Sequence, residues 1–186
     1  TGYETSFWAE SFLTDPVWMN EYDIILFNCG LDDTELMMGT SNASNAIANL
    51  RDFVTEGGSV YASDWASEII RMAFPGRINF LGNDSSFGEA RYGEANSSQA
   101  AAVVDLNLES ALGRRNLTLN LDLPQWVVLD ARSTQPEDLR ILVQSNITYY
   151  EYLAGLWPVS QSLTDSPIVV HFEAGEGRVL YTTAHN

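Results

Sequence analysis

Polar side chains that could do chemistry follow three apolar runs of the sequence, at residues 23–28, 59–63 and 178–183. Each run is typical of a strand buried on both faces of a sheet, and ligands of open α/β sheets bind beyond the carboxyl ends of the strands. The residues that come after the three runs are Asp32, Asp33, Asp64, Trp65, His185 and Asn186. We therefore expect them to share one edge of a sheet, where the last four form a ligand-binding site.

Carboxylates from separate loops could hold a metal ion at this edge. Asp32, Asp33 and Asp64 offer oxygen ligands, which Ca²⁺ and Mg²⁺ prefer. The alternative that we favour makes Asp33 and Asp64 helix N-caps, because such a cap stabilises a helix by about 1 kcal/mol. Beyond this possible cation, the sequence indicates no cofactor.

Asp64 and His185 could also form an acid–base pair, in which the carboxylate orients the imidazole and a water molecule is activated for hydrolysis. The alternative that we favour is a hydrogen bond retained at a site without activity. A Ser63–His185 nucleophile is disfavoured, because Ser63 lacks a G-x-S-x-G motif. His171 lies within a predicted strand and is interpreted as an ordinary sheet residue.

The chain of 186 residues has 25 acidic and 9 basic side chains, for a net charge of −16, and all nine bases are arginine. Such a surface repels phosphate backbones, so nucleic acid is excluded as a partner. A high-salt habitat and a lineage bias both explain the absence of lysine. No apolar run is long enough to span a membrane. The single Cys29 excludes a disulfide within the chain, and the start at Thr1 indicates a processed product or fragment.

Five N-x-S/T sequons point to a glycosylated chain outside the cell or on its surface. They begin at Asn42, Asn83, Asn96, Asn116 and Asn146. We expect a glycan on at least one of Asn83, Asn96 and Asn116, which lie in polar, turn-rich segments. The alternative is a polar, loop-rich composition that produces sequons by chance.

The pattern of elements predicts one α/β domain over residues 1–186, with a mainly parallel sheet flanked by helices. Apolar residues at helical spacing predict a helix over 44–55, which ends at Gly57 and Gly58. Strand–helix–strand order indicates parallel pairing. Short strand-like runs within residues 83–166 predict an antiparallel extension. The glycine-bearing loop at 173–177 predicts a hairpin between flanking strands.

Two stretches, YDIILFNCG with NLRDFVTEGGSVYASDW and PIVVHFEAGEGRVLYTTAHN, resemble the class I glutamine-amidotransferase-like superfamily, especially its trehalose-utilisation-like branch. The resemblance implies a flavodoxin-like sheet and a nucleophilic cysteine at the turn after the central strand. Asp64 occupies that position here, and His185 matches the catalytic histidine. Cys29 follows a different strand. The resemblance therefore implies that the catalytic cysteine is not retained and that Asp64 and His185 lie close together.

Loss of the nucleophile favours a non-catalytic domain of an extracellular or cell-surface protein, with a structural, filament-forming or recognition role. Its partners would be other subunits or domains of the same protein. One alternative is a hydrolase or carbohydrate-modifying enzyme that uses Asp64 and His185. Another is a carbohydrate-binding module in which Trp65 stacks on a sugar ring.

The strand predicted at 23–28 lacks the strand and helix that precede it in the resembled fold. It should therefore have an open side or a substitute neighbour, because unpaired backbone groups are costly when buried. That side could be filled in three ways: by a segment of the same chain, by a strand donated from another subunit, or by a unit present only in the full gene product.

Overall fold

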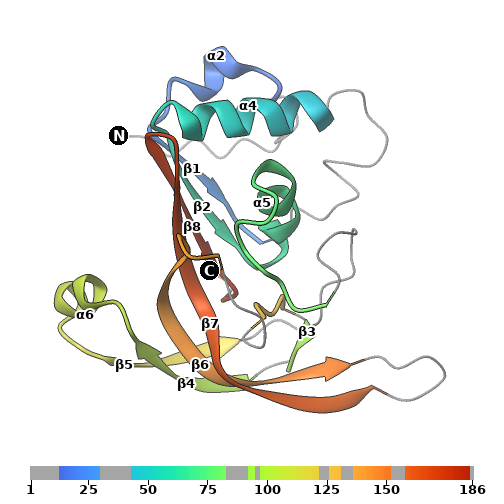
Figure 1. The fold of residues 1–186 in the computed structure, drawn as a ribbon, viewed down its shortest axis with the longest axis vertical. Helices are drawn as coiled ribbons and strands as arrows, with labels where there is room; N and C mark the ends of the chain where they lie inside the picture. The colour runs from blue at the N-terminus through green and yellow to red at the C-terminus, as the bar shows by residue number, and fades with distance from the viewer. Residues whose placement is uncertain are drawn as a thin grey trace.

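The structure, a computed structural model, describes residues 13–29, 43–82, 92–94, 97–121, 126–130, 136–151 and 158–184. One eight-stranded sheet runs through them in the order β1-β2-β8-β7-β6-β4-β5, with β3 paired to β6 (Figure 1). The strands are β1 (Ile24–Phe27), β2 (Ser59–Ser63), β3 (Tyr92–Gly93), β4 (Ser97–Val103), β5 (Asn116–Leu121), β6 (Arg140–Glu151), β7 (Val159–Ala174) and β8 (Gly177–Thr182). The helices are α2 (Pro16–Met19), α4 (Ala43–Thr55), the 3₁₀ turn η1 (Asp64–Ala66), α5 (Ser67–Ala73) and α6 (Leu106–Leu112).

The three strands predicted to be parallel are confirmed, because β1 pairs in parallel with β2 and β2 with β8. The remaining pairings are antiparallel, so the described sheet as a whole is mixed. The α/β class with an antiparallel extension is as predicted, while parallel pairing among the described strands is confined to these three. Among the described strands, β1 has β2 as its one neighbour, so its other side is open in this part of the chain.

Helix α4 connects β1 to β2 and ends where the sequence predicts. Ala46, Leu50 and Val54 lie along its buried side. Gly57 has φ of +119°, a conformation that glycine adopts readily, and its N–H donates to the Val54 carbonyl at 3.0 Å. The helix can therefore turn directly into β2.

The hairpin of β7 and β8 is also as predicted, with Gly175 at φ of +61° in its turn. In the extension, residues 126–129, one of the short strand-like runs predicted within 83–166, do not form a regular strand. They form two isolated bridges, Phe80↔Leu129 and Tyr92↔Val127, in place of a regular strand. Val127 and Leu129 belong to one hydrophobic cluster and Trp126 and Val128 to the other, so this segment lies between two cores.

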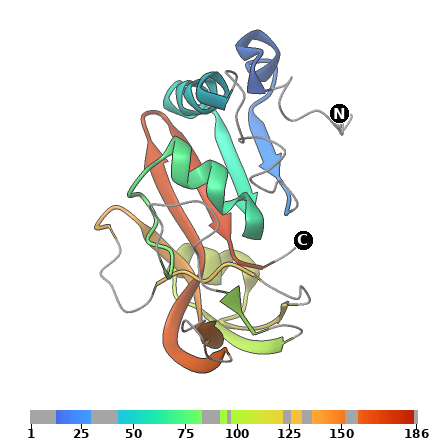
Figure 2. The same ribbon diagram turned by 90° about the vertical axis from the view of Figure 1, so that its right-hand side faces the viewer.

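The two faces of the parallel strands differ in their surroundings. Helices α4 and α5 lie over one face, which we call the covered face (Figure 2). Its side chains are buried and come from alternate positions: Ile25, Phe27, Val60, Ala62, Val179, Tyr181, Val170 and Phe172. The covered face and its two helices form the first hydrophobic cluster.

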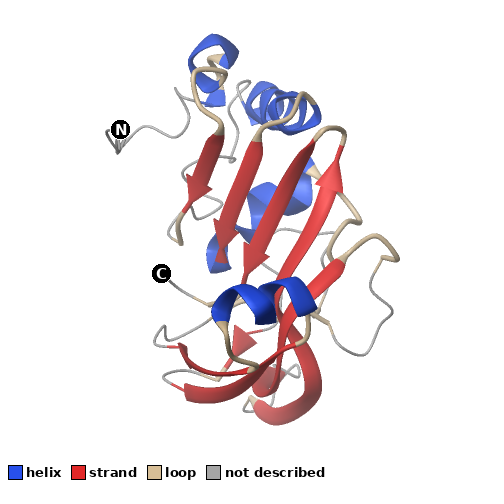
Figure 3. Ribbon diagram, turned by 90° about the vertical axis from the view of Figure 1, so that its left-hand side faces the viewer, coloured by secondary structure: helices blue, strands red, loops and turns tan. Residues whose placement is uncertain are grey.

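The opposite face, which we call the open face, carries the intervening residues. They are Ile24, Leu26, Ser59, Tyr61, Arg178, Leu180, His171 and Glu173. In Figure 3 these strands face the viewer, and α6 lies at their lower end. Ile24 is 58% exposed and Leu26 is 57% exposed. The prediction that residues 23–28 are buried on both faces is therefore wrong for the described structure, because no described helix packs over these two side chains.

None of the described helices is long and apolar enough to cross a membrane.

Candidate functional site

Asp64 lies at the sharp turn where β2 ends. Its φ is +45°, which is uncommon for a residue with a side chain and costs on the order of 1–3 kcal/mol. It begins η1, and the N-cap of that turn is Ser63, whose side chain makes no capping hydrogen bond. The interpretation of Asp64 as a helix N-cap is therefore wrong. Its carboxylate serves a more distant part of the chain.

The Asp64 side chain is fully buried, and both carboxylate oxygens accept hydrogen bonds. The backbone N–H of Val127 donates to Oδ1 at 2.7 Å. The thiol of Cys29 donates to Oδ2 at 3.6 Å, within the range for sulfur. These bonds compensate for the burial of a carboxylate, which is costly without partners. Asp64 therefore connects the ends of β1 and β2 to the segment 126–130.

The ends of β1, β2 and β8 are joined by two further hydrogen bonds at this turn. The Tyr181 hydroxyl donates to the Asp64 carbonyl at 2.8 Å, and the Cys29 N–H donates to the Ser63 hydroxyl at 3.1 Å. Burial, followed by the negative charge of Asp64, raises the pKa of Tyr181 well above its usual value of 10.0. The phenol therefore stays protonated and remains a donor.

Cys29 is the residue that sequence reasoning placed outside the site and that the structure places in it. It follows β1, which is the direct parallel neighbour of β2. The carboxyl ends of parallel neighbours meet at one edge of the sheet. The position of Cys29 directly after an apolar run could therefore have predicted that it lies beside Asp64. The structure brings together Cys29, Ser63, Asp64 and Tyr181.

Trp65, the residue after Asp64, contacts an aromatic side chain from the extension. Its ring centroid lies 5.3 Å from that of Tyr92, with 41° between the ring planes. Both side chains are half-buried. An aromatic pair of this kind provides an apolar surface with polar N–H and O–H groups. The pair lies next to the turn that positions Asp64, on the side of β3.

Several predicted site residues lie outside the described part of the chain. They are Asp32, Asp33, His185 and Asn186, together with the sequon residues Asn42, Asn83 and Asn96. The proximity of Asp64 and His185 therefore stays a prediction. Within the described ranges, no three His, Cys, Asp or Glu side chains form a group that could hold a metal ion. Asp64 directs its carboxylate at Val127 and Cys29.

The two described sequon residues have exposed side chains. Asn116 begins β5, and Asn146 lies within β6, where its side-chain oxygen accepts the Asp165 N–H at 3.0 Å. Exposure leaves room for a glycan at both positions but does not test whether one is attached.

No family model and no curated protein matches this sequence. Solved structures do match its fold. A cytoplasmic protein from Salmonella typhimurium is 13% identical, with a TM-score of 0.57 over 95% of this chain and 68% of that one. A ThuA-like protein from Bacteroides uniformis is 12% identical, with a TM-score of 0.60 over 97% of this chain and 66% of that one. This chain thus spans about two thirds of the length of these structures.

A third match is to a β-galactosidase from Bacillus circulans sp. alkalophilus. It is 10% identical, with a TM-score of 0.52 over 89% of this chain and 20% of that one. The fold of this chain therefore corresponds to about a fifth of that much longer protein.

The predicted extracellular or cell-surface location is wrong on this comparison, because two of the similar structures are described as cytoplasmic proteins. Glycosylation, which was predicted from the sequons, stays a prediction. The predicted resemblance in fold is confirmed: residues 13–184, where described, have an α/β fold similar to that of a ThuA-like protein.

Proposed function

We propose that this chain is a non-catalytic domain, in which Asp64 stabilises the turn that holds the nucleophilic cysteine in the resembled superfamily, and that it acts in recognition or assembly. One observation carries the proposal. The Asp64 carboxylate is fully buried and both of its oxygens accept hydrogen bonds from the protein. A nucleophile or general base must instead come within hydrogen-bonding distance of a substrate atom.

The neighbouring thiol supports the same conclusion. Cys29 donates its S–H to Asp64, whereas an attacking cysteine must lose that proton to a base or to a positive environment. The arrangement around the turn is one that holds three strand ends together.

The similarity to one fifth of a β-galactosidase supports a domain that works beside other parts of a larger assembly. Its partners on this proposal are other protein chains or domains. The fold itself does not specify a function.

The test compares Asp64→Asn and Asp64→Ala with Asp52→Asn, an exposed control on α4. Loss of both acceptors leaves the buried Val127 N–H unpaired, so Asp64→Ala should lower the free energy of unfolding by about 2–4 kcal/mol. Asp64→Asn keeps an acceptor for Val127 and should cost less. Stability is measured by urea denaturation, and hydrolysis is measured with glutamine and with a panel of nitrophenyl glycosides.

We expect no hydrolysis by the wild-type chain. The proposal would be overturned if the wild type hydrolysed a substrate, folded Asp64→Asn did not, and Asp52→Asn still did. That result would show that Asp64 is catalytic. A stability unchanged in Asp64→Ala would remove its structural basis.

The Trp65–Tyr92 contact favours a second candidate function, carbohydrate binding. A half-buried aromatic pair at the ligand end of a sheet could stack on a sugar ring. Calorimetric titration with galactose and trehalose tests this, with Trp65→Ala as the variant and Trp18→Ala as a control outside the site. Binding that Trp65→Ala abolishes and Trp18→Ala retains would support it, and absence of binding would exclude these two sugars.

A further inference from the structure

Strand β5 is an edge of the described sheet, because among the described strands β4 is its one neighbour. Its six residues, NLTLNL, include no charged residue and no proline, and its pairing with β4 runs without a register shift. Natural sheets usually protect an exposed edge with a charge, a proline, a bulge or a very short strand. The other described edge, β1, has four residues and follows Asp23. In this part of the chain, β5 is therefore the edge better suited to pair with another strand.

The backbone groups of alternate β5 residues point away from β4. The Val103 N–H donates to the Arg115 carbonyl at 2.8 Å, so these two opposite residues form a hydrogen-bonded pair. In an antiparallel ladder such pairs alternate with pairs that exchange no hydrogen bond. Counting along β5 from Arg115, the N–H and C=O groups of Asn116, Thr118 and Asn120 are directed at the open edge. A strand placed there would meet a donor and an acceptor at each of these residues.

The side chains of β5 alternate between the two faces of the sheet. Leu117 and Leu119 are half-buried and pack against the second hydrophobic cluster. Asn116, Thr118 and Asn120 are exposed on the other face. The sequence of these five residues, N-L-T-L-N, reads the same in both directions. An antiparallel copy of the strand therefore presents the same order of side chains as the original.

This symmetry selects one register, in which Thr118 lies opposite Thr118 of a second copy on a two-fold axis. Leu117 then lies opposite Leu119 of the second copy, and Asn116 opposite Asn120. Opposite residues of an antiparallel pair share a face, so leucine meets leucine beside the cluster and polar side chains meet on the exposed face. The same register joins the outward N–H and C=O groups of Thr118 to their own copies. A register centred on Leu119 loses this central pair, because the backbone groups of Leu119 point at β4.

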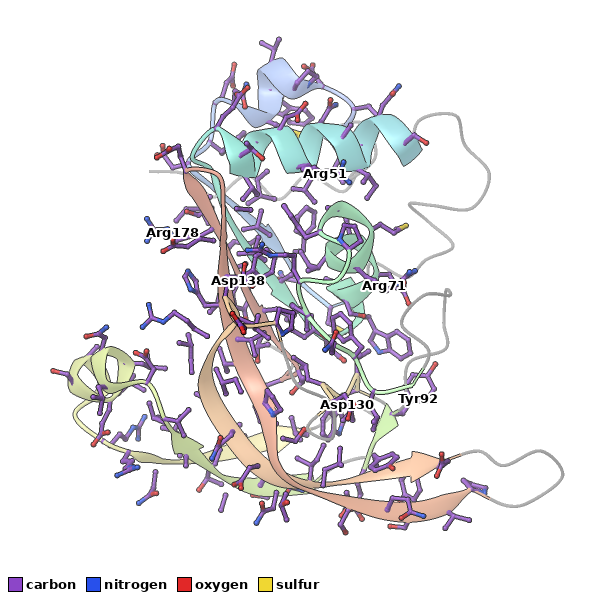
Figure 4. All side chains as sticks on the ribbon, in the orientation of Figure 1. Arg51, Arg71, Tyr92, Asp130, Asp138 and Arg178 are labelled. Carbon is purple, nitrogen blue, oxygen red and sulfur yellow. The ribbon has the colours of Figure 1, made fainter. Side chains whose placement is uncertain are left out.

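Local charge permits this contact although the whole chain is negative. The net charge is −16, so most of the surface would repel a second copy. Residues 97–121 contain two acidic and two basic side chains, whose charges cancel: Asp105, Glu109, Arg114 and Arg115. Strands β4 and β5 lie at the end of the molecule opposite α4, away from Arg51 and Arg178 (Figures 1 and 4). Two copies that meet through β5 therefore approach each other at a neutral region.

We propose that two copies of this chain join through β5, in an antiparallel two-fold pairing centred on Thr118. The pairing extends one sheet across both copies. It rests on the role in assembly proposed above, for which it names the partner, and it does not involve Asp64. Six residues extend about 20 Å, so the pairing buries roughly 200–300 Å² on each copy, less than the about 800 Å² of a standard interface. The dimer should therefore form at high concentration and dissociate on dilution.

Sedimentation equilibrium of the chain between about 10 µM and about 1 mM, a range suited to a small interface, tests the pairing. We expect the average mass to rise from that of the monomer, 20.6 kDa, toward twice that value. A mass that stays at the monomer value throughout would overturn the proposal. Hydrolysis, measured as above, tests the non-catalytic role separately, so failure of one proposal is distinguishable from failure of the other.

Charges introduced at residue 118 test the register. Thr118→Lys and Thr118→Glu each place like charges opposite one another, which destabilises a strand pair, so each variant alone should associate at least tenfold more weakly than the wild type. An equimolar mixture of the two should recover the dimer, because opposite charges then meet on the axis. Both variants change an exposed side chain, so thermal melts should show that they remain folded.

Thr164→Lys is the matched control, because Thr164 is an exposed threonine of β7, away from the β5 edge. It should associate as the wild type does. Association of Thr118→Lys as strong as that of the wild type would overturn the proposal. A mixture of Thr118→Lys and Thr118→Glu that associates no better than either variant alone would also overturn it, because residue 118 would then not lie on the axis.

Discussion

On the covered face of β1, Ile25 and Phe27 are 7% and 4% exposed, whereas on the open face Ile24 and Leu26 are 58% and 57% exposed. The four residues are consecutive and all are large and apolar. Their composition therefore does not distinguish the faces, and the difference comes from α4 and α5, which lie on one side (Figures 2 and 3). The burial of a side chain in this sheet is therefore determined by whether a helix packs on its face. Similar substitutions on the two faces should have unequal effects on the free energy of unfolding.

The largest effect should come from Phe172 on the covered face. Its ring lies 5.4 Å from that of Phe74, and Arg77 lies over it at 5.0 Å. Phe172→Ala should lower the free energy of unfolding by about 3–5 kcal/mol, because it leaves a cavity. Glu173→Ala, the exposed neighbour on the open face, should change it by less than about 0.5 kcal/mol. Urea denaturation of both variants measures the contrast, and equal losses would contradict it.

Gly177 should be the next most sensitive position, because α4 approaches β8 there. A Cβ atom at this residue would lie 2.1 Å from the Val54 carbonyl oxygen and 2.2 Å from that of Gly58. Gly177→Ala should therefore destabilise the fold by about 3 kcal/mol, since backbone must move. At Gly113 a Cβ meets nothing within 4 Å, although φ is +66°. Gly113→Ala should lower the free energy of unfolding by about 1 kcal/mol. A larger loss of Tm in Gly113→Ala than in Gly177→Ala would contradict this and would show that the α4 backbone can move to make room for a Cβ at residue 177.

The same substitution at adjacent residues of β1 gives a direct comparison of the faces. Ile25→Thr should cost about 2 kcal/mol, because it buries a hydroxyl and removes apolar contacts. Leu26→Thr should cost less than about 0.5 kcal/mol, since threonine suits a strand and the site is exposed. Chemical denaturation of the two variants is the measurement. A large loss in Leu26→Thr would mean that the isolated chain covers its open face.

The smallest effect concerns pH and His171 on the open face. Burial, and next the charge of Arg140, lower the pKa of His171 below its usual value of 6.5. Arg178 acts in the same direction, while Glu173 and Asp105 oppose it. As pH falls below about 6.5, the unfolded chain takes up this proton more readily than the folded chain, so stability is lost. The loss of Tm between pH 7.5 and 5.5 should be smaller in His171→Gln than in the wild type, and an equal or larger loss in the variant would contradict this.

Local patterns were enough to predict β1, β2, α4 and the hairpin of β7 and β8, because each is an apolar run or helical repeat bounded by glycine. Helix α6 was missed, since none of its seven residues is fully buried and Leu108 packs only partly against the second cluster. Its capping residues were visible all the same: Asp105 accepts the Leu108 N–H at 2.9 Å, and Gly113 ends the helix at φ of +66°.

The site was predicted in part because its geometry depends on contacts distant in sequence. Asp64 was correctly expected at the end of β2. Its positive φ and its bond to Val127, 63 residues away, could not be inferred from neighbouring residues. Cys29 joins the site through the pairing of β1 with β2. A prediction of strand order, in addition to strand position, was needed to place the thiol beside the carboxylate.

The long strands β6 and β7 contribute to both hydrophobic clusters. Val170 and Phe172 of β7 belong to the first cluster, and Leu163 and Ile168 of the same strand belong to the second. Because β7 contributes side chains to both clusters, loss of packing in one cluster should also disturb β7 where it packs in the other. The described parts of the chain should therefore unfold as one cooperative unit, in which damage to the extension is felt at the parallel strands.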